Sequence, residues 1–288
     1  MNRIGIIGGS GLYDLPGLTD TQWVQVDTPW GRPSDEVFLG TLGGVGLAFL
    51  PRHGRGHRIP PSEVNYRANI AALKQLGVAD VLSLSAVGSL REDLAPGTFV
   101  VVDQFIDRTT SRASSFFGTG MVAHVSMAHP VCARLSAHLQ RALATSAAPH
   151  AIGGTYVAME GPQFSSLAES RLYRSWQADV IGMTNLPEAK LAREAELCYA
   201  TIAMVTDFDC WHPGHDSVSV QAILAVLLAN ASRAQQLVVD IAGAVGHDPH
   251  GAGCACRRAL DHALITAPAA RDPAMVDKLR GIAGRVLS

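Results

Sequence analysis

Short apolar runs alternate with amphipathic stretches along this chain. Continuous apolar runs predict buried strands at 3–7, 45–50, 81–86 and 99–102, with further strands at 152–159, 179–183 and 198–205. Capping and proline signals predict helices from Ser62 to about Leu76, from the capping box Ser166-x-x-Glu169, over 187–197 and over 219–242. Because the strands are apolar throughout and alternate with helices, we expect an α/β fold with a largely parallel sheet covered on both faces.

Polar residues follow the ends of several of these strands. In parallel sheets, ligands bind beyond the carboxyl ends of the strands. The residues at those positions are Ser10, Arg52, His53, Ser85, Met183, Thr184, Asp207 and Asp209. We therefore expect five strands to bring anion donors and carboxylates to one edge of the sheet.

The first strand opens into Gly8-Gly9-Ser10-Gly11. The spacing fits neither a dinucleotide fingerprint nor a Walker A loop, because no frame supplies the third glycine and no Gly-Lys-Ser/Thr follows. What remains is either a turn whose amides and Ser10 hydroxyl hold one phosphate-sized anion, or a tight turn alone.

The segment from Arg52 to Arg58 holds three Arg and two His with no acid among them. A solvated basic loop is one interpretation. We favour an anion site, because the segment directly follows a buried strand and Arg can hold a tetrahedral oxyanion with a two-pronged hydrogen bond.

Asp207 and Asp209 lie two residues apart in Thr206-Asp207-Phe208-Asp209. Their side chains would point the same way if the chain stays extended, and mutual repulsion would then raise one pKa and hold that carboxyl ready to donate a proton. A helix cap for the following segment is the competing interpretation.

Composition limits the class of protein. With 48% hydrophobic residues and a net charge of −2 over 288 residues, we expect a single folded domain over 1–288, with a helical C-terminal extension from about 245. A near-neutral balance predicts no general attraction to nucleic acid or anionic membrane. The most apolar stretch, 218–231, is interrupted by Ser219, Gln221 and Asn230, so we expect no membrane span. The apolar run before Gly8 is too short for a secretory signal, and we therefore expect a cytoplasmic protein.

Two groups of metal-ligating residue types stand out: Cys210 with His212 and His215, and His247 with His250, Cys254 and Cys256. The second group suits zinc in its ligand types, but Cys-x-Cys is tighter than the usual spacing, so a redox-sensitive pair or buried thiols are favoured and no metal is expected. Cys132, Cys198 and Cys210 are expected to be ordinary buried thiols.

A series of motifs in order from residue 4 to about 230 carries a specific resemblance. The segments are Gly8–Leu12, Thr28–Gly31, Pro51–Gly54, Pro61–Asn69, Glu160–Ser166, Met183-Thr184, Pro187-Glu188 and Thr206–Trp211. They resemble the S-methyl-5'-thioadenosine phosphorylases, a branch of the trimeric purine nucleoside phosphorylase family. The resemblance implies one α/β/α sandwich with a mixed, largely parallel sheet, and a homotrimer with active sites at subunit interfaces. It implies that inorganic phosphate displaces adenine from methylthioadenosine, without metal or organic cofactor.

The resemblance also implies roles for particular residues. Phosphate would be held by Ser10, Arg52, His53, Ser85 and Thr184, with Ala86 nearby, and Met183 would pack on the ribose. Phe164 would flank the purine beside Ser165, Asp207 would protonate or hydrogen-bond N7, and Asp209 would accept from the 6-amino group. The methylthio group would be enclosed by Val220, Ile223 and Leu224 and by His124 of a neighbouring subunit, although the three apolar residues can also be core alone.

Three departures and three rival functions remain. Ser10 and Ser85 stand where related enzymes often have Thr, and Gln163 where Arg is common. A phosphorylase of 6-oxopurine nucleosides or methylthioinosine is the nearest rival; such enzymes usually have Asn in place of Asp207, whose ionised form would face a 6-oxo group unfavourably. A nucleosidase that uses water and a nicotinamide-binding module are the others.

Overall fold

The computed structural model describes residues 3–9, 11–214, 219–248 and 253–287, and its centre is a mixed sheet. β1 (Arg3–Gly8) lies between β4 (Val45–Pro51) and β5 (Val78–Ser89) and is parallel to both. β11 (Cys198–Asp207) runs parallel to β5 along most of its length. These central strands coincide with the apolar runs in the sequence. They are buried on both faces, so they show no alternation of apolar with exposed polar residues, and polar side chains within them, such as Ser83 and Thr201, are buried and hydrogen-bonded.

The remaining strands extend the sheet on both sides, and it branches at β5. The strand order is β2-β3-β4-β1-β5-β10-β9-β7, while β11 leaves β5 in a second direction toward β6 and β8. Their bounds are β2 Thr19–Val24, β3 Val37–Leu42, β6 Phe99–Val102, β7 Gln104–Arg108, β8 His150–Ile152, β9 Thr155–Met159 and β10 Val180–Gly182. Most neighbouring pairs are parallel, and β2-β3, β3-β4, β5-β10 and β6-β11 are antiparallel.

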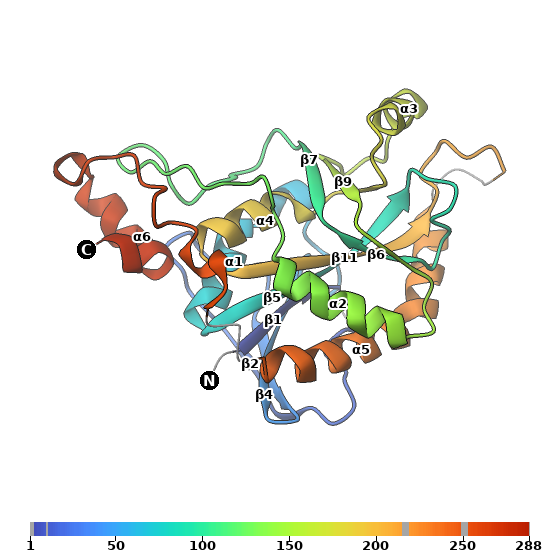
Figure 1. Ribbon diagram of the computed structural model, residues 1–288, viewed down its shortest axis with the longest axis horizontal. Helices are drawn as coiled ribbons and strands as arrows, with labels where there is room; N and C mark the ends of the chain where they lie inside the picture. The colour runs from blue at the N-terminus through green and yellow to red at the C-terminus, as the bar shows by residue number, and fades with distance from the viewer. Residues whose placement is uncertain (1–2, 10, 215–218, 249–252, 288) are drawn as a thin grey trace.

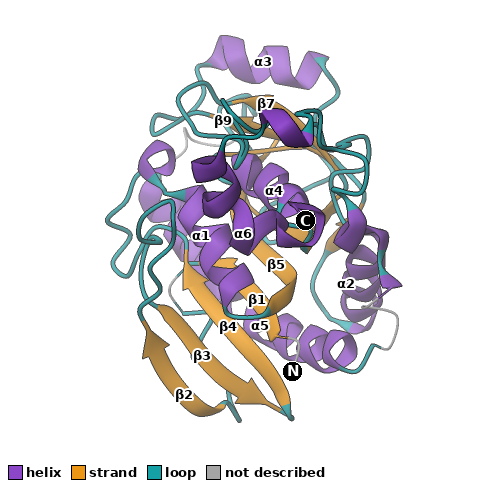
Figure 2. Ribbon diagram, turned by 90° about the vertical axis from the view of Figure 1, so that its left-hand side faces the viewer, coloured by secondary structure: helices purple, strands orange, loops and turns teal. Residues whose placement is uncertain are grey.

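Helices cover both faces of the sheet (Figures 1 and 2). One face carries α1 (Tyr66–Gln75), α4 (Asn185–Glu194) and α6 (Pro273–Leu287). The other carries α2 (Ala133–Thr145) and α5 (Val220–Gly246), which lie side by side. The predicted α/β/α sandwich with a mixed, largely parallel sheet is confirmed.

Helix starts differ from the sequence prediction at two places. Ser62 lies in the short 3-10 helix η1 (Pro61–Glu63), and α1 begins after Asn65, whose side chain accepts the N–H of Ala68. Asn is as good a cap as Ser, and Val64 and Asn65 break the helical path between the two candidates. By contrast, the capping box of Ser166 and Glu169 at α3 (Leu167–Ser175) is confirmed.

Other predicted boundaries shift for local reasons. The expected strand 152–159 is two strands, because Gly153 and Gly154 adopt positive φ and turn the chain between β8 and β9. The helix expected from Pro187 is part of α4, which begins at Asn185. The sequence analysis did not predict β2, β3, β7 or α2, and it expected a helical C-terminal extension from about 245 without giving the bounds of α6.

The two halves of α5 lie in different environments. Leu237, Ile241 and Val245 are buried against the sheet and α2, whereas Val220 and Leu224 are 61% and 51% exposed. The apolar side chains of α5 are therefore buried in its second half only. α5 is long and apolar enough to cross a membrane by length and composition, a signal that the search for an unbroken apolar run missed, but its second half is a core helix.

The C-terminal segment returns across the molecule after α5. It contains η3 (Ala255–Arg258) and η4 (Pro268–Ala270) and ends with α6, whose Leu279 and Ile282 are buried in the same core as α1. Arg285 of α6 pairs with the buried Glu196 at 2.5 Å. α6 therefore packs on the face that α1 and α4 cover, whereas Cys256 of η3 is buried on the face of α2 and α5.

Candidate active site

Arg52, the residue after β4, is buried at 3% exposure and held in a fixed position. Its Nε and Nη2 donate to the two carboxylate oxygens of Glu188 at 2.9 and 3.2 Å, Nη2 also donates to Ser83 Oγ at 2.6 Å, and Nη1 donates to the Leu84 carbonyl at 3.0 Å. A guanidinium has five N–H groups, so within the described residues these four bonds leave one Nη1 hydrogen for a ligand.

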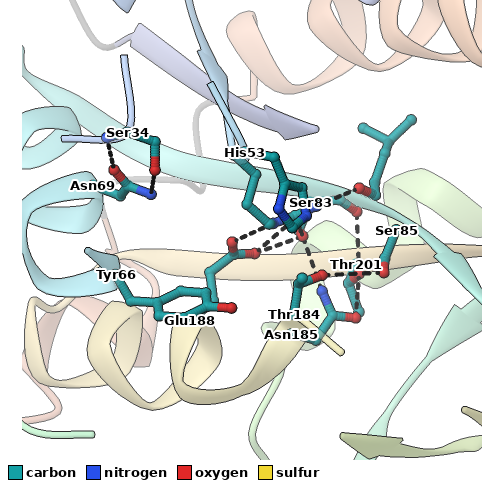
Figure 3. Close-up of polar contacts among 12 residues, drawn as sticks. Ser34, His53, Tyr66, Asn69, Ser83, Ser85, Thr184, Asn185, Glu188 and Thr201 are labelled. Atoms are coloured by element: carbon teal, nitrogen blue, oxygen red, sulfur yellow. Dashed lines mark hydrogen bonds and ion pairs between the residues drawn. The ribbon is translucent and has the colours of Figure 1, made fainter. Parts of the chain in front are cut away.

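Glu188 is the functional residue that the sequence analysis missed most clearly. It is 1% exposed and accepts from Arg52 and from Ser83 Oγ at 2.6 Å (Figure 3), and also from the Tyr199 hydroxyl at 2.9 Å. Asn185 extends this network by donating to Ser83 at 3.0 Å. A buried carboxylate with this many donors fixes the orientation of the guanidinium. Only its place in the Pro187-Glu188 pair marked it in the sequence.

The rest of the predicted basic loop is neutralised by residues that precede it. Arg55 pairs with Asp35 and Glu36, both at 2.8 Å, and Arg58 lies 3.9 Å from Asp35. The sequence contains no acid within the loop, but the hairpin before it supplies two. The prediction of an anion site therefore narrows from the whole loop to Arg52 and His53.

His53 is a neutral imidazole with a defined tautomer. Its Nδ1 lies 2.8 Å from the Ile59 carbonyl, which can only accept, so Nδ1 carries the proton and Nε2 is an acceptor. Burial, and then the positive charge of Arg52, lower the pKa of His53 to about 4. His57 stacks on this ring at 4.2 Å. Nε2 is thus suited to accept a hydrogen from a protonated oxyanion such as hydrogen phosphate.

Two hydroxyl groups lie next to this basic pair. Ser85 Oγ is 3.4 Å from Thr184 Oγ1 and 3.2 Å from the Tyr156 hydroxyl, and Ser85 and Thr184 are both buried (Figure 3). Ser85 lies within β5 and not past its end, which corrects the strand boundary. Thr184 reaches it because β10 runs antiparallel to β5, so the chain leaving β10 returns along β5 toward Ser85.

The glycine turn also approaches Arg52. The Arg52 N–H donates to the Gly8 carbonyl at 3.0 Å, and Gly11 has φ of +109°. Ser10, which the sequence predicts to bind phosphate, lies outside the described residues. The backbone bond places the end of β1 beside the start of the basic loop, as the strand-end argument predicted.

Arg112 joins two loops that carry predicted substrate contacts, and the sequence analysis did not single it out. Its side chain is 1% exposed, and it donates to the Glu160 carbonyl at 2.6 Å, the Leu186 carbonyl at 2.8 Å and the Met183 carbonyl. It also pairs with the Glu160 carboxylate at 3.2 Å. Because its acceptors are mostly carbonyls, no motif around residue 112 could reveal this role.

Arg112 thereby positions Met183 relative to the loop before α3. Gly161 has φ of +67°, and a Cβ at this position would lie 2.5 Å from Met183 Sδ, so the two loops touch where only glycine fits. Further along this loop, Phe164 is 43% exposed and Ser165 is buried. The structure therefore brings Met183 and the Phe164 loop together.

Asp207 and Asp209 adopt a turn and not the extended path that we expected. Asp209 has φ of +50°, and its N–H donates to Asp207 Oδ1 at 2.8 Å. Thr206 donates to the other oxygen, Oδ2, at 2.7 Å. Burial raises the pKa of both carboxyl groups, whereas the charge of Asp207 is a lesser contribution at Asp209, so desolvation and not mutual repulsion is the main cause.

Two parts of the candidate site, one around Arg52 and one around Asp207, both contact strand β5. Arg52 donates to the carbonyl of Leu84, and Asp207 pairs with Gly88 in the register of β5 and β11. Four residues of extended chain separate Leu84 from Gly88, a span of about 13 Å. An anion donor and a buried carboxyl at this separation can act on opposite ends of one small molecule, with Ser85 and exposed Ala86 between them.

Four predicted contacts of the 5' end lie on exposed surfaces of this chain. Val220 and Leu224 are more than half exposed on α5, Ile223 is partly exposed, and His124 is exposed on the loop before α2, where its backbone N–H donates to the Ala263 carbonyl at 2.8 Å. They are not buried in the core of the described chain, which removes the core interpretation for the three apolar residues.

The described histidines of the two groups considered as metal ligands, and Cys210, have other hydrogen-bond partners. His212 Nε2 bonds to Glu92 at 2.9 Å, and Cys210 Sγ donates to the Ser165 carbonyl at 3.3 Å. His247 Nδ1 lies 2.8 Å from the Gly243 carbonyl, and His215 and His250 lie outside the described residues. Cys254 and Cys256 instead meet Cys132 and Cys198.

Known proteins resemble this chain over nearly its whole length. The family model described as "Phosphorylase superfamily" matches residues 3–242. The S-methyl-5'-thioadenosine phosphorylase of Cereibacter sphaeroides is 61% identical over 289 residues, which cover 99% of this chain and 98% of that protein. The S-methyl-5'-thioadenosine phosphorylase of Rhodospirillum rubrum is 60% identical over 284 residues, covering 99% and 97%.

Solved structures agree with the sequence relatives. A methylthioadenosine phosphorylase from an Antarctic soil metagenomic library superposes with a TM-score of 0.91 at 50% identity, over 98% of each chain. A mutant adenosine/methylthioadenosine phosphorylase of Schistosoma mansoni in complex with methylthioadenosine has a TM-score of 0.80 at 38% identity, over 90% of this chain and 97% of that one.

Proposed function

This chain belongs to the phosphorylase superfamily, among the S-methyl-5'-thioadenosine phosphorylases, and from that premise we propose the reaction that its site performs. Inorganic phosphate attacks C1' of S-methyl-5'-thioadenosine, and the products are adenine and 5-methylthioribose 1-phosphate. The single observation that carries the assignment is that Arg52 and Asp207 contact β5 at positions four residues apart. Arg52 donates to the Leu84 carbonyl, and Asp207 pairs with Gly88.

The anion half binds and orients the nucleophile. Arg52 offers one N–H from a position fixed by Glu188, and Ser85 and Thr184 offer hydroxyl donors. His53 Nε2 accepts the hydrogen of hydrogen phosphate and leaves an unprotonated oxygen to face C1'. Ser10 would add a further donor at the glycine turn. Arg–phosphate bonds of this type are the strong, charge-assisted kind.

The base half receives the leaving group. As the bond between C1' and N9 breaks, its electron pair passes to the purine, and a proton at N7 neutralises the charge. Because burial raises the pKa of Asp207, its carboxyl group is suited to share a proton with N7, while Asp209 accepts from the 6-amino group. Over the whole reaction one proton leaves hydrogen phosphate and adenine gains one: the phosphate proton is released to solvent, and Asp207, which gives its proton to N7, regains one from solvent.

The sugar and its 5' substituent lie between these halves. Met183 packs beneath the ribose, and Phe164 and Ser165 border the purine. The exposed Val220, Ile223 and Leu224 form the apolar wall of the methylthio pocket, which His124 of a neighbouring subunit completes. This arrangement requires an oligomer, and we propose a homotrimer; light scattering coupled to size-exclusion chromatography measures it directly.

The proposed reaction uses phosphate as co-substrate and no metal or organic cofactor in catalysis, since protein groups neutralise both the nucleophile and the leaving base. We also propose that the enzyme acts in the cytoplasm and binds neither nucleic acid nor membrane. The decisive test is chromatography of the products from methylthioadenosine with and without phosphate. Methylthioribose formed without phosphate would identify a nucleosidase instead.

A phosphorylase of methylthioinosine or another 6-oxopurine nucleoside is the second candidate. Asp207 and Asp209 both face the base half as carboxyl groups, and an acceptor-rich edge favours a purine that carries a 6-amino group. A comparison of kcat/KM on methylthioadenosine and methylthioinosine separates the two candidates.

A further inference from the structure

Four of the five cysteines of this chain gather at one point in the fold. Cys132 precedes α2, Cys198 opens β11, and Cys254 and Cys256 come from the C-terminal segment around η3. Three of these thiols are buried and Cys254 is partly exposed. Segments up to 124 residues apart in sequence thus bring their cysteine sulfur atoms together in one cluster.

The four sulfur atoms have the geometry of one coordination sphere. All of them lie within 4.8 Å of one another, and the Cys132 and Cys254 sulfurs are 3.6 Å apart. A tetrahedral zinc ion with Zn–S bonds of about 2.3 Å places its sulfur ligands about 3.8 Å apart. Two disulfides would instead sort the sulfurs into two pairs with bonds of about 2.05 Å, and the four thiols show no such pairing.

Positive side chains border this cluster. Arg193 Nη1 donates to Cys256 Sγ at 3.6 Å, and the Arg134 guanidinium lies close enough to Cys198 for the two side chains to interact. Among the described residues, Arg134 Nε is buried and has no hydrogen-bond acceptor, so this side of the cluster carries an unpaired donor. Zinc with four thiolates carries a net charge of −2, which the Arg193 guanidinium opposes directly, whereas Arg134 is also paired with Asp80 and Asp248.

We propose that Cys132, Cys198, Cys254 and Cys256 bind one zinc ion as a closed, structural tetrathiolate site. Four thiols lose four protons to solvent as the ion binds, and no oxidant or reductant is needed. Four sulfur ligands select zinc or iron–sulfur chemistry, and the close packing of the sulfurs favours a single ion over a cluster that spreads its ligands over several metal atoms. This revises the sequence expectation of no metal.

The site lies far from the reaction proposed above. Cys198 begins β11 and Asp207 ends it, so nine residues of strand, about 30 Å, separate the sulfur cluster from the base half of the active site. The ion therefore acts on the fold: it ties the C-terminal segment to α2 and β11, on the way from α5 to α6. The proposal stands independently of the proposed activity.

The first experiment uses the intact wild-type protein, purified without chelator. Elemental analysis is expected to find about one zinc per chain, and substitution by Co²⁺ is expected to give the visible absorption of a tetrahedral tetrathiolate. Removal of the ion should lower Tm and expose the C-terminal segment to protease. A chain with five free thiols that takes up neither ion would overturn the proposal, as would a non-reduced mass four hydrogens below the reduced mass, which shows two disulfides.

Matched cysteine variants give the second test. Cys254→Ser and Cys256→Ser are expected to reduce zinc to below about a tenth of an ion per chain, because a site that loses one of four ligands binds far more weakly. Cys210→Ser, which changes the one cysteine outside the cluster, should retain the full complement. Equal zinc content in all three variants would contradict the assignment. If a cluster variant fails to fold, the cobalt spectrum of the wild-type protein still decides.

Discussion

The Asp207 carboxylate lies directly over Gly88. The two residues pair in the register of β11 and β5, and a Cβ at Gly88 would lie 2.8 Å from Asp207 Oδ1 and 3.2 Å from the Asp209 N–H. Any side chain at residue 88 must therefore displace the carboxyl group that receives the base. Glycine is required here by close approach and not by backbone conformation.

Gly88→Ala should lower kcat/KM for methylthioadenosine by about 100-fold, since a displacement near 1 Å at a reacting group has an effect of this size. Phosphate affinity should change little, because Arg52 lies at the other end of the site. Gly281→Ala, at a position with open space around it, is the matched control. Equal loss of phosphate affinity and turnover would indicate general unfolding and contradict this account.

Arg52→Ala should raise the phosphate KM by about 10- to 150-fold, the loss of a charge-assisted hydrogen bond worth about 1.5–3 kcal/mol. The same variant leaves Glu188 buried without its partner and should destabilise the fold by about 3–5 kcal/mol. The double variant Arg52→Met/Glu188→Met separates the two effects. It should recover stability in urea titrations while the phosphate KM stays high; recovery of both would refute the anion site.

Arg112→Met should raise the KM for methylthioadenosine about tenfold or more, because the loops of Met183 and Phe164 lose their common donor. The phosphate KM should change less, since Arg52, Ser85 and Thr184 keep their contacts. Exposed Arg171→Met in α3 is the control. If Tm falls while the KM for methylthioadenosine is unchanged, Arg112 stabilises the fold but does not position the substrate loops, which would contradict this prediction.

His53 makes stability depend on pH. In the folded protein the pKa of His53 is about 4, below the ordinary value of 6.5. Between pH 4 and pH 6.5 the unfolded chain therefore binds a proton at His53 that the folded chain does not bind. The associated stability is present above pH 6.5 and is lost as pH falls toward 4, by at most about 3 kcal/mol. Asp207 and Asp209, whose pKa values are raised, act in the opposite direction.

His53→Gln isolates this contribution. Urea midpoints between pH 7 and pH 4.5 should fall less steeply in the variant than in the wild type, and exposed His129→Gln should follow the wild type. The same slope in all three proteins would show that His53 is not held neutral.

Asp207→Asn should shift preference toward 6-oxopurines, because the Asn amide always presents both a donor and an acceptor, whereas the Asp207 carboxyl presents a donor only while it carries the proton that it shares with N7. The ratio of kcat/KM for methylthioadenosine to that for methylthioinosine should fall by about 100-fold or more. Kinetics on both nucleosides measure this ratio. An unchanged ratio would leave Asp209 or the backbone as the determinant of base choice.

The sequence predicted the central strands and the strand-end residues because those signals are local. Arg52, Thr184 and Asp207 follow from apolar runs that end at polar residues. Ser85 was misplaced relative to its strand, because β5 continues to Ser89 to pair with β10. Asp209 was expected on an extended path; aspartate is among the residues that adopt positive φ more often than most, but this weak preference does not predict the turn.

The residues that sequence reasoning missed act through distant partners. Glu188 meets Arg52 across 136 residues, and Arg112 meets Met183 across 71. The acids that neutralise Arg55 come from a preceding hairpin, and the thiol cluster joins segments whose spacing follows no metal motif. Such pairs are set by topology, which no short window of sequence contains.

Arg112 has one more consequence, which concerns how this site can change over evolution. Apart from its ion pair with Glu160 it binds carbonyl oxygens, which every amino acid supplies, so side chains on the Met183 and Phe164 loops other than Glu160 and Gly161 can be exchanged without losing these bonds. New nucleosides can then be accommodated by altering what the loops display, while their spacing above β5 is inherited unchanged.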